Sequence, residues 1–270
     1  MSVRMAVGQF LPGEDKAANL AVIGELVRSA SREGTRLLVL PEYASFATAG
    51  LDRRIVEAAE PVDGPFVTRV AALAREHGLA VVVGVNEEIP GADRIHNTLV
   101  LIGPGGDVQG VYRKLHLYDA FGVRESAWMV PGELSAPALM AVDGVTVAAQ
   151  TCYDLRFPEV TRSLVGAGAD AVLVAAQWAP GPQKEGHWTT LLRARAIENT
   201  AYVAAAAQGP PLGCGHSMII DPKGVLVAGL GERTGVACGS VDPRRIAAVR
   251  SENPVLAARR FDVVPGRRES

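Results

Sequence analysis

Three residues that could do chemistry lie at or near the ends of strand-like segments. Cys152 follows the apolar run 145–150, and Glu42 follows the apolar run 36–40. Lys114 lies in a segment in which apolar and polar residues alternate. In α/β proteins ligands bind at the edge of a sheet where strands end, so Cys152 and Glu42 could lie at such an edge, while Lys114 is predicted to lie inside a strand. The three residues therefore form a candidate catalytic set.

Cys152 is predicted to lie where a strand gives way to a helix at 157–166. Free backbone N–H groups and the positive end of a helix dipole can lower the pKa of a thiol from about 8.5, so that more of it is thiolate, the nucleophilic form. A single cysteine is equally compatible with the alternative of a small buried apolar residue.

Lys114 and Glu42 also have simpler alternatives when each is taken singly. Lys114 is two residues from both Tyr112 and His116, so a strand here would direct all three side chains to one face. Lys114 could instead be a solvated strand lysine, and Glu42 an acid in a surface loop. The case for catalysis depends on the three residues occurring together.

The segments LPEY (40–43), YRKLHLYD (112–119) and TCYDLRFPE (151–159) resemble the nitrilase, or carbon–nitrogen hydrolase, superfamily, which uses Glu, Lys and Cys in this chain order. The resemblance continues through further segments and covers nearly the whole chain; these are 186–199, 215–222 and 253–262. It implies an α/β fold of the α-β-β-α sandwich type with two similar halves. We accordingly expect one hydrolase domain over residues 1–262 and a C-terminal tail over 263–270.

The resemblance assigns roles to the candidate residues. Cys152 would attack an amide carbonyl and form a thioester, while Glu42 would accept and return the protons. Lys114 and the backbone N–H of Tyr153 would stabilise the oxyanion. Glu125 is the best match for a second glutamate of the family, although the preceding loop is shorter than in several relatives, so that a solvated loop acid is the alternative. No cofactor and no metal ion is expected.

The residues after the nucleophile bear on the substrate. CYDLRFPE is similar to the amidase branch that contains omega-amidases and deaminated-glutathione amidases, whereas true nitrilases usually have Trp-Glu after the cysteine. This resemblance implies a small amide substrate that carries a carboxylate, for which Arg156 and Arg124 are candidate ligands. Arg156 could instead pair with Asp154 or Glu159. Trp178 could line the pocket or cap the sheet.

Several alternatives to this function remain open. The segment 183–186 reads Gln-Lys-Glu-Gly where relatives often have Thr-Gly before the His-Trp pair. This difference weakens any inference of the substrate from those relatives. An N-carbamoyl amino acid amidohydrolase, an acyltransferase, which usually has membrane spans, and a non-catalytic metabolite-binding member are the competing functions. A Cys–His mechanism through His116 or His187 is a minor alternative, and both histidines are expected to be structural. Cys214 and His216 have no convincing metal-site spacing.

The pattern along the chain predicts alternating strands and helices with hairpins between them, hence an α/β protein. Predicted strands span 4–10, 36–40, 80–87, 98–102, 111–114, 145–151, 171–176, 202–207, 217–220 and 225–229. Predicted helices span 16–32, 65–77, 158–166 and 187–199, with another short helix near Ile246. The helix at 187–199 has a broad apolar stripe. The resemblance implies that this helix and the one at 158–166 pair with their copies in a homodimer.

Composition limits the remaining possibilities. The net charge of −2 gives no electrostatic reason to expect a nucleic-acid or anionic-membrane partner. Three cysteines without a CxxC pair argue against a disulfide framework and for a reducing compartment. No segment has the length of a membrane span or the pattern of a signal peptide. We therefore expect a cytoplasmic enzyme.

Overall fold

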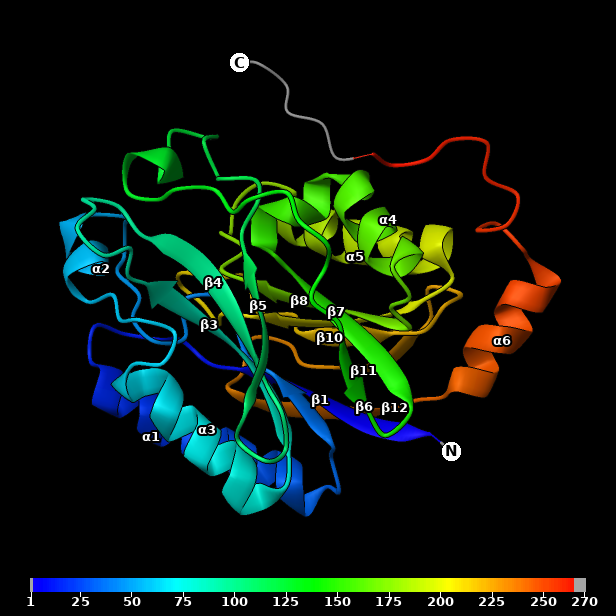
Figure 1. The fold of residues 1–270 in the computed structure, drawn as a ribbon, viewed down its shortest axis with the longest axis horizontal. Coiled ribbons are helices and arrows are strands. Elements are labelled where there is room, and N and C mark those ends of the chain that lie inside the picture. Colours follow the sequence, from blue (N-terminus) through cyan, green and yellow to red (C-terminus); the bar gives the residue numbers. More distant parts are fainter. Residues whose placement is uncertain (1, 265–270) are drawn as a thin grey trace.

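Two six-stranded mixed sheets form the centre of the computed structural model, which describes residues 2–264 (Figure 1). The first sheet contains, in spatial order, β12 (Gly235–Val241), β1 (Val3–Gln9), β2 (Leu37–Val39), β3 (Ala80–Glu87), β4 (His96–Ile102) and β5 (Val108–Arg113). The second contains β11 (Leu226–Gly229), β10 (Met218–Ile220), β9 (Tyr202–Ala207), β8 (Ala171–Ala176), β7 (Val145–Thr151) and β6 (Met140–Val142). Strands β1, β2 and β3 are parallel, as are β7, β8 and β9.

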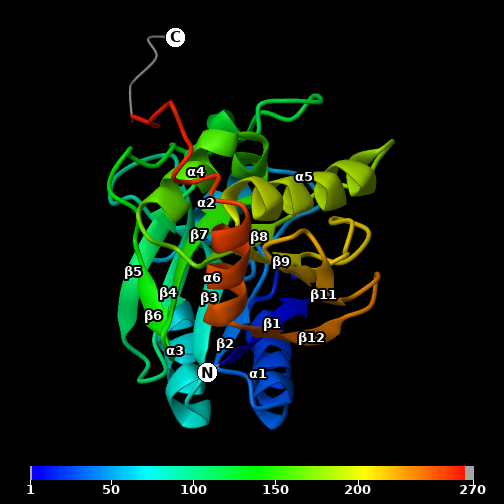
Figure 2. The same ribbon diagram turned by 90° about the vertical axis from the view of Figure 1, so that its right-hand side faces the viewer.

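Helices cover the outer face of each sheet, so the layers run α-β-β-α (Figures 1 and 2). Helices α1 (Lys16–Arg32) and α3 (Pro65–His77) pack on the first sheet, and α4 (Pro158–Gly166) and α5 (Lys184–Asn199) pack on the second. Between the sheets lies a shared apolar core. Because their central strands are buried on both faces, these strands consist of nearly continuous apolar residues. The predicted α/β sandwich is confirmed.

Most predicted elements are found within a few residues of their predicted bounds. The strand over Ala80–Glu87 and the helices over Lys16–Arg32 and Pro65–His77 are found as predicted. Helix α5 begins at Lys184, three residues earlier than predicted. The helix near Ile246 is α6 (Pro243–Glu252).

The sequence prediction was wrong or incomplete at four places. Strand β5 ends at Arg113, so Lys114 is the first residue after the strand rather than a member of it. Strands β6 and β12 and helix α2 (Arg53–Glu57) were not predicted. The three residues of β6 are too few to display a period, and the two glycines of β12 interrupt its apolar pattern.

The close approach of two backbones places Glu42 at the sheet edge. A Cβ atom on Gly84 of β3 would lie 2.5 Å from the Pro41 carbonyl oxygen and 2.7 Å from the Glu42 Cα atom. Ser45 N–H donates to the Gly84 carbonyl at 3.2 Å, which holds the segment after β2 against β3. Glycine is therefore required at position 84 for the Glu42 segment to lie this close.

Residues 253–264 follow α6 without forming a helix or strand and are largely exposed. The predicted tail begins among them, and its last six residues, 265–270, lie outside the described residues. Among the helices of residues 2–264, none has the combination of length and apolar character needed to cross a bilayer.

Candidate active site

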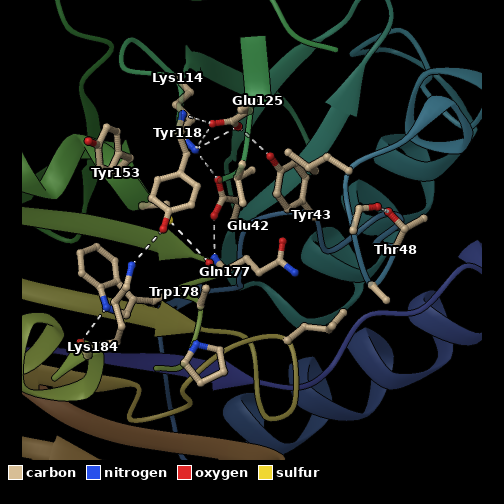
Figure 3. Close-up of a pocket in the computed structure, with 18 of the residues that line it drawn as sticks. Glu42, Tyr43, Thr48, Lys114, Tyr118, Glu125, Tyr153, Gln177, Trp178 and Lys184 are labelled. Carbon is tan, nitrogen blue, oxygen red and sulfur yellow. Dashed lines mark hydrogen bonds and ion pairs between the residues drawn. The ribbon is translucent and has the colours of Figure 1, made fainter. Parts of the chain in front are cut away.

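A cavity of about 270 Å³ opens where four strand ends meet, and it brings Glu42, Lys114, Cys152 and Glu125 together (Figure 3). Glu42 lies beyond the end of β2, Lys114 directly follows β5, and Cys152 directly follows β7. Trp178, two residues past the end of β8, also lines the cavity. The cavity is at the small end of the range of ligand sites, which suits a small molecule.

Lys114 is held between two carboxylates. Its Nζ atom lies 3.0 Å from Glu42 Oε1 and 2.8 Å from Glu125 Oε2 (Figure 3). The three residues are at most 2 % exposed. The alternatives of a solvated strand lysine and of two solvated loop acids are therefore wrong. The single ammonium offsets part of the charge of the two buried carboxylates, and they in turn stabilise it.

Glu42 is fixed by contacts to both of its carboxylate oxygens. Asn97 Nδ2 donates to Oε1 at 2.7 Å, and the backbone N–H of Gln177 donates to Oε2 at 2.6 Å. Gln208 Nε2 also donates to the Glu42 carbonyl oxygen at 2.8 Å. These donors come from β4, from the segment after β8 and from the segment after β9. Both sheets therefore position this one side chain.

Glu125 begins the short 3₁₀ helix η1 (Glu125–Ala127) and is buried despite the shortened loop before it. Tyr43 donates its hydroxyl proton to Glu125 Oε1 at 2.7 Å, and Asn97 Nδ2 donates to the same atom at 3.1 Å. The backbone N–H of Tyr118 donates to Oε2. Asn97 thus bridges the two glutamates.

Burial and the neighbouring charges determine the protonation states of Lys114, Glu125 and Tyr43. Burial alone would lower the pKa of Lys114, but Glu125 and then Glu42 raise it well above its usual value. Burial would raise the pKa of Glu125, but the Lys114 ammonium lowers it below its usual value. Burial and the charge of Glu125 raise the pKa of Tyr43, so Tyr43 is a neutral donor. Lys114 is therefore a cation and cannot serve as the base near neutral pH.

The electrostatic environment of Cys152 differs from the one predicted from the sequence. It begins the 3₁₀ helix η2 (Cys152–Arg156), its φ angle is 45°, and it is 8 % exposed. Burial, and then the Glu42 carboxylate, raise the pKa of the Cys152 thiol well above its usual value, and Lys114 compensates only in part. The predicted lowering of this pKa is wrong, because burial and a nearby carboxylate outweigh the start of a five-residue helix. Cys152 is a protonated thiol beside a carboxylate.

Asp154 ties the turn that carries Cys152 to the segment that carries Lys114. The buried Asp154 carboxylate accepts hydrogen bonds from the Tyr112 hydroxyl at 2.6 Å and from His116 N–H at 2.9 Å, and His116 Nδ1 is 2.8 Å from it. Tyr112 and His116 stand on either side of Lys114 in the sequence. The Asp154 side chain therefore fixes the position of the turn that carries Cys152 relative to the segment that carries Lys114.

The histidines have structural contacts. The His116 ring stacks on Phe157 with the ring centroids 3.6 Å apart, and His187 Nδ1 lies 3.5 Å from Arg156 Nη2. Within residues 2–264, neither ring is hydrogen-bonded to Cys152, and no group of three or more His, Cys, Asp or Glu side chains has metal-site geometry.

The predicted substrate ligands separate into two groups. Arg156 lines the cavity with its guanidinium 4.9 Å from the centroid of the Trp178 ring. Arg156 forms no ion pair with Asp154 or Glu159. Arg124 is exposed and does not line the cavity, so the prediction that it contacts a substrate there is wrong. Tyr153 directly follows Cys152 and also lines the cavity.

Several residues of the site were missed by reasoning from sequence; these are Tyr43, Asn97, Tyr118, Gln177 and Lys184. Lys184 lay in the segment that departs from the Thr-Gly of relatives, which was the one available signal. Asn97 is a polar residue in β4, directly before the predicted strand 98–102, and could have been singled out for that reason. Tyr43 and Tyr118 lie in the segments LPEY and YRKLHLYD but were given no role, and Gln177 has no local pattern that distinguishes it.

Known proteins resemble this chain in sequence and in structure. The sequence profile of the carbon-nitrogen hydrolase family matches residues 4–251. A hydrolase of Mycobacterium tuberculosis is 38% identical over 270 residues, covering 94% of each chain. A deaminated glutathione amidase of Escherichia coli O157:H7 is 37% identical and covers 95% of this chain and 97% of its own. The crystal structure of Saccharomyces cerevisiae Nit3, a member of branch 10 of the nitrilase superfamily, superposes with a TM-score of 0.86 at 28% identity, covering 96% of this chain and 97% of that one.

Proposed function

The chain belongs to the carbon–nitrogen hydrolase family, and from this premise we propose that it is a cysteine-dependent amidase that cleaves a small carboxylated amide through a thioester. The observation that carries the proposal is the buried Lys114 ammonium held by Glu42 and Glu125 in the cavity that Cys152 lines. This arrangement supplies a nucleophile, a base and a fixed cation in one small site.

Cys152 Sγ attacks the amide carbonyl carbon while its proton passes to Glu42. Because the thiol is protonated at rest, proton transfer must accompany attack, and the adjacent Glu42 carboxylate is the group available to accept it. The carbonyl π electrons move to oxygen as the S–C bond forms. Lys114 and the backbone N–H of Tyr153 stabilise this oxyanion, and a single such donor is typically worth about 10²–10³ in rate.

Collapse of the tetrahedral adduct breaks the C–N bond. The leaving nitrogen takes the proton from Glu42 and departs as ammonia or an amine, leaving a thioester on Cys152. Glu42 then accepts a proton from water as the water oxygen adds to the thioester carbonyl carbon. Cleavage of the S–C bond releases the carboxylic acid, and the thiolate recovers the proton. Glu125 stays ionised and holds Lys114, since its pKa is lowered.

A carboxylated substrate is supported by Arg156. Its guanidinium lines the cavity and lies over Trp178, and its Nε atom is buried without a hydrogen-bond partner. A planar cation in this position can bind a substrate carboxylate by paired hydrogen bonds. The name of the E. coli relative, a deaminated glutathione amidase, points to the same class of substrate.

The test is ammonia release from short dicarboxylic acid monoamides, ureido acids and nitriles, with Cys152→Ala beside the wild type. Cys238→Ala is the matched control, because Cys238 does not line the cavity. We expect release from a monoamide that is lost in Cys152→Ala and retained in Cys238→Ala. Release from ureido acids alone would instead favour an N-carbamoyl amidohydrolase. Activity that survives in Cys152→Ala would contradict a cysteine mechanism.

We also propose that the enzyme is a cytoplasmic homodimer. Exposed apolar side chains on α5 and on the segment after α6 support an interface between two copies, as exposed apolar surface commonly marks such sites. Ile197, Phe261 and Val264 are 49 %, 89 % and 79 % exposed. The three free cysteines suit a reducing compartment.

A further inference from the structure

Besides Lys114 and Arg156, the cavity wall carries a further cation, Lys184, which no sequence argument assigned to the site. Lys184 is the first residue of α5, lines the cavity and is half-buried. Its Nζ atom donates to the Tyr118 hydroxyl at 2.9 Å (Figure 3). The same atom lies 3.8 Å from the centroid of the Phe121 ring. The ammonium is therefore held at a defined place in the wall.

Lys184 lacks an anionic partner of its own. Within residues 2–264, no carboxylate lies within ion-pair distance of Lys184 or of Arg156. The partner of Lys184 is the Tyr118 hydroxyl, which carries only a dipole, whereas a carboxylate would add the attraction between opposite charges to the hydrogen bond. A substrate carboxylate would therefore be a stronger partner for Lys184 than the Tyr118 hydroxyl is.

The two cations are held by different aromatic groups and come from different elements. Arg156 belongs to η2 and lies over Trp178, whereas Lys184 belongs to α5 and lies over Phe121 and Tyr118. Trp178 Nε1 donates to the Lys184 carbonyl at 2.8 Å, which fixes where α5 begins relative to the stacked Arg156. A single small site thus presents two separate, unneutralised cations.

We propose that Lys184 binds a second carboxylate, distinct from the one bound by Arg156, so that the preferred substrate is a small dianionic amide. This inference rests on the proposed amidase function. One negative charge would leave one cation unpaired, whereas two would neutralise both in a cavity too small for a long chain.

The test compares the kcat/KM of two dianionic substrates with that of monoanionic glutaric acid monoamide. N-glutarylglycine carries carboxylates on both sides of the amide, and tricarballylic acid monoamide carries both on the acyl side. We expect Lys184→Met to lower the dianion-to-monoanion ratio at least about tenfold for one of them, the loss expected for a hydrogen bond between charged groups. The affected substrate identifies the side of the second carboxylate.

Three variants test whether Lys184 recognises the charge of the substrate or only supports the loop that contains Tyr118. Lys184→Arg should retain most of the ratio, since it keeps the cation. Tyr118→Phe removes the hydroxyl that Lys184 contacts. It should change the kcat/KM of dianionic and monoanionic substrates by similar factors. Lys223→Met is the matched surface control, because Lys223 pairs with Glu252 and does not line the cavity. A ratio that stays within twofold in Lys184→Met, or that falls equally in Tyr118→Phe, overturns the inference.

Calorimetry separates failure of this inference from failure of the proposed reaction. If the wild type hydrolyses none of these amides, binding of the two dianions to wild type and to Lys184→Met is measured directly. Binding that is lost in Lys184→Met supports the anion site although the reaction proposal fails. No binding of either dianion to the wild type overturns the site itself.

Discussion

The Nζ atom of Lys114 lies 2.8 Å from Oε2 of Glu125, and neither residue is more than 2 % exposed. Eleven positions separate the two residues, and Lys114 also reaches Glu42, which lies 72 positions earlier. The charge of the site is therefore organised around Lys114, with one carboxylate left to act as base and one to hold the ammonium in place. This arrangement leads to the following predictions.

Replacing Lys114 by Met should abolish ammonia release and destabilise the fold. Removal of the ammonium leaves two buried carboxylates facing each other, and such an unpaired buried charge typically costs about 3–5 kcal/mol. Urea unfolding measures this loss. The double variant Lys114→Met with Glu125→Gln should recover much of the stability but none of the activity. Equal instability of the single and double variants would contradict the charge argument.

Cys152 should react slowly with iodoacetamide near neutral pH, and faster as the pH rises above 9, because burial and Glu42 raise the pKa of its thiol. In Glu42→Gln, alkylation at pH 8 should be faster although ammonia release is lost. Mass spectrometry distinguishes Cys152 from Cys214, whose pKa burial raises to about 12. Slower alkylation in Glu42→Gln would show instead that Glu42 promotes ionisation of the resting thiol.

Asp154→Asn should lower kcat more than it raises KM, because Asp154 positions Cys152 and Lys114 without lining the cavity. Loss of hydrogen bonds to a buried charge should also cost about 1–3 kcal/mol of stability. Steady-state kinetics and thermal unfolding measure the two effects. Asp143→Asn is the control, since Asp143 is an exposed partner of Arg36. An unchanged kcat in Asp154→Asn would remove the positioning role.

Glu125 should contribute to the acid sensitivity of the fold. Its pKa in the folded protein is lowered from 4.5, so its contribution to stability is fully present above about pH 4.5 and is lost as the pH falls through the folded pKa. The difference in free energy of unfolding between wild type and Glu125→Gln should therefore shrink below pH 4.5. Denaturant titrations between pH 7 and pH 3 measure it. A difference that grows on acidification would mean that the folded pKa is raised.

The proposed homodimer should have twice the chain mass by light scattering. Ile197→Glu should lower that mass toward the monomer value, because it places a charge at an exposed apolar side chain of α5 that the proposed interface would bury. Val108→Glu is a matched control on β5, where the side chain is 45 % exposed. A monomeric wild type would contradict the proposal.

Much of the fold follows from local patterns in the sequence. Short continuous apolar runs such as 171–176 and 202–207 indicate buried strands, and Pro65 and Gly78 delimit a helix by their backbone preferences. The sequence also identified Glu42 and Cys152 as candidates from reactive residue types after apolar strands, and Lys114 from its occurrence with them in this chain order. These features depend on residues that are close together in the chain.

Only the tertiary structure decided which distant groups meet and what their charges become. Asn97 and the Gln177 N–H reach Glu42 from 55 and 135 positions away, so no local pattern could indicate them. The raised pKa of Cys152 depends on burial and on Glu42, and the presence of Lys184 rather than Arg124 in the cavity depends on how α5 packs. Burial and long-range proximity are properties of the packed chain, and they determine the electrostatics of this site.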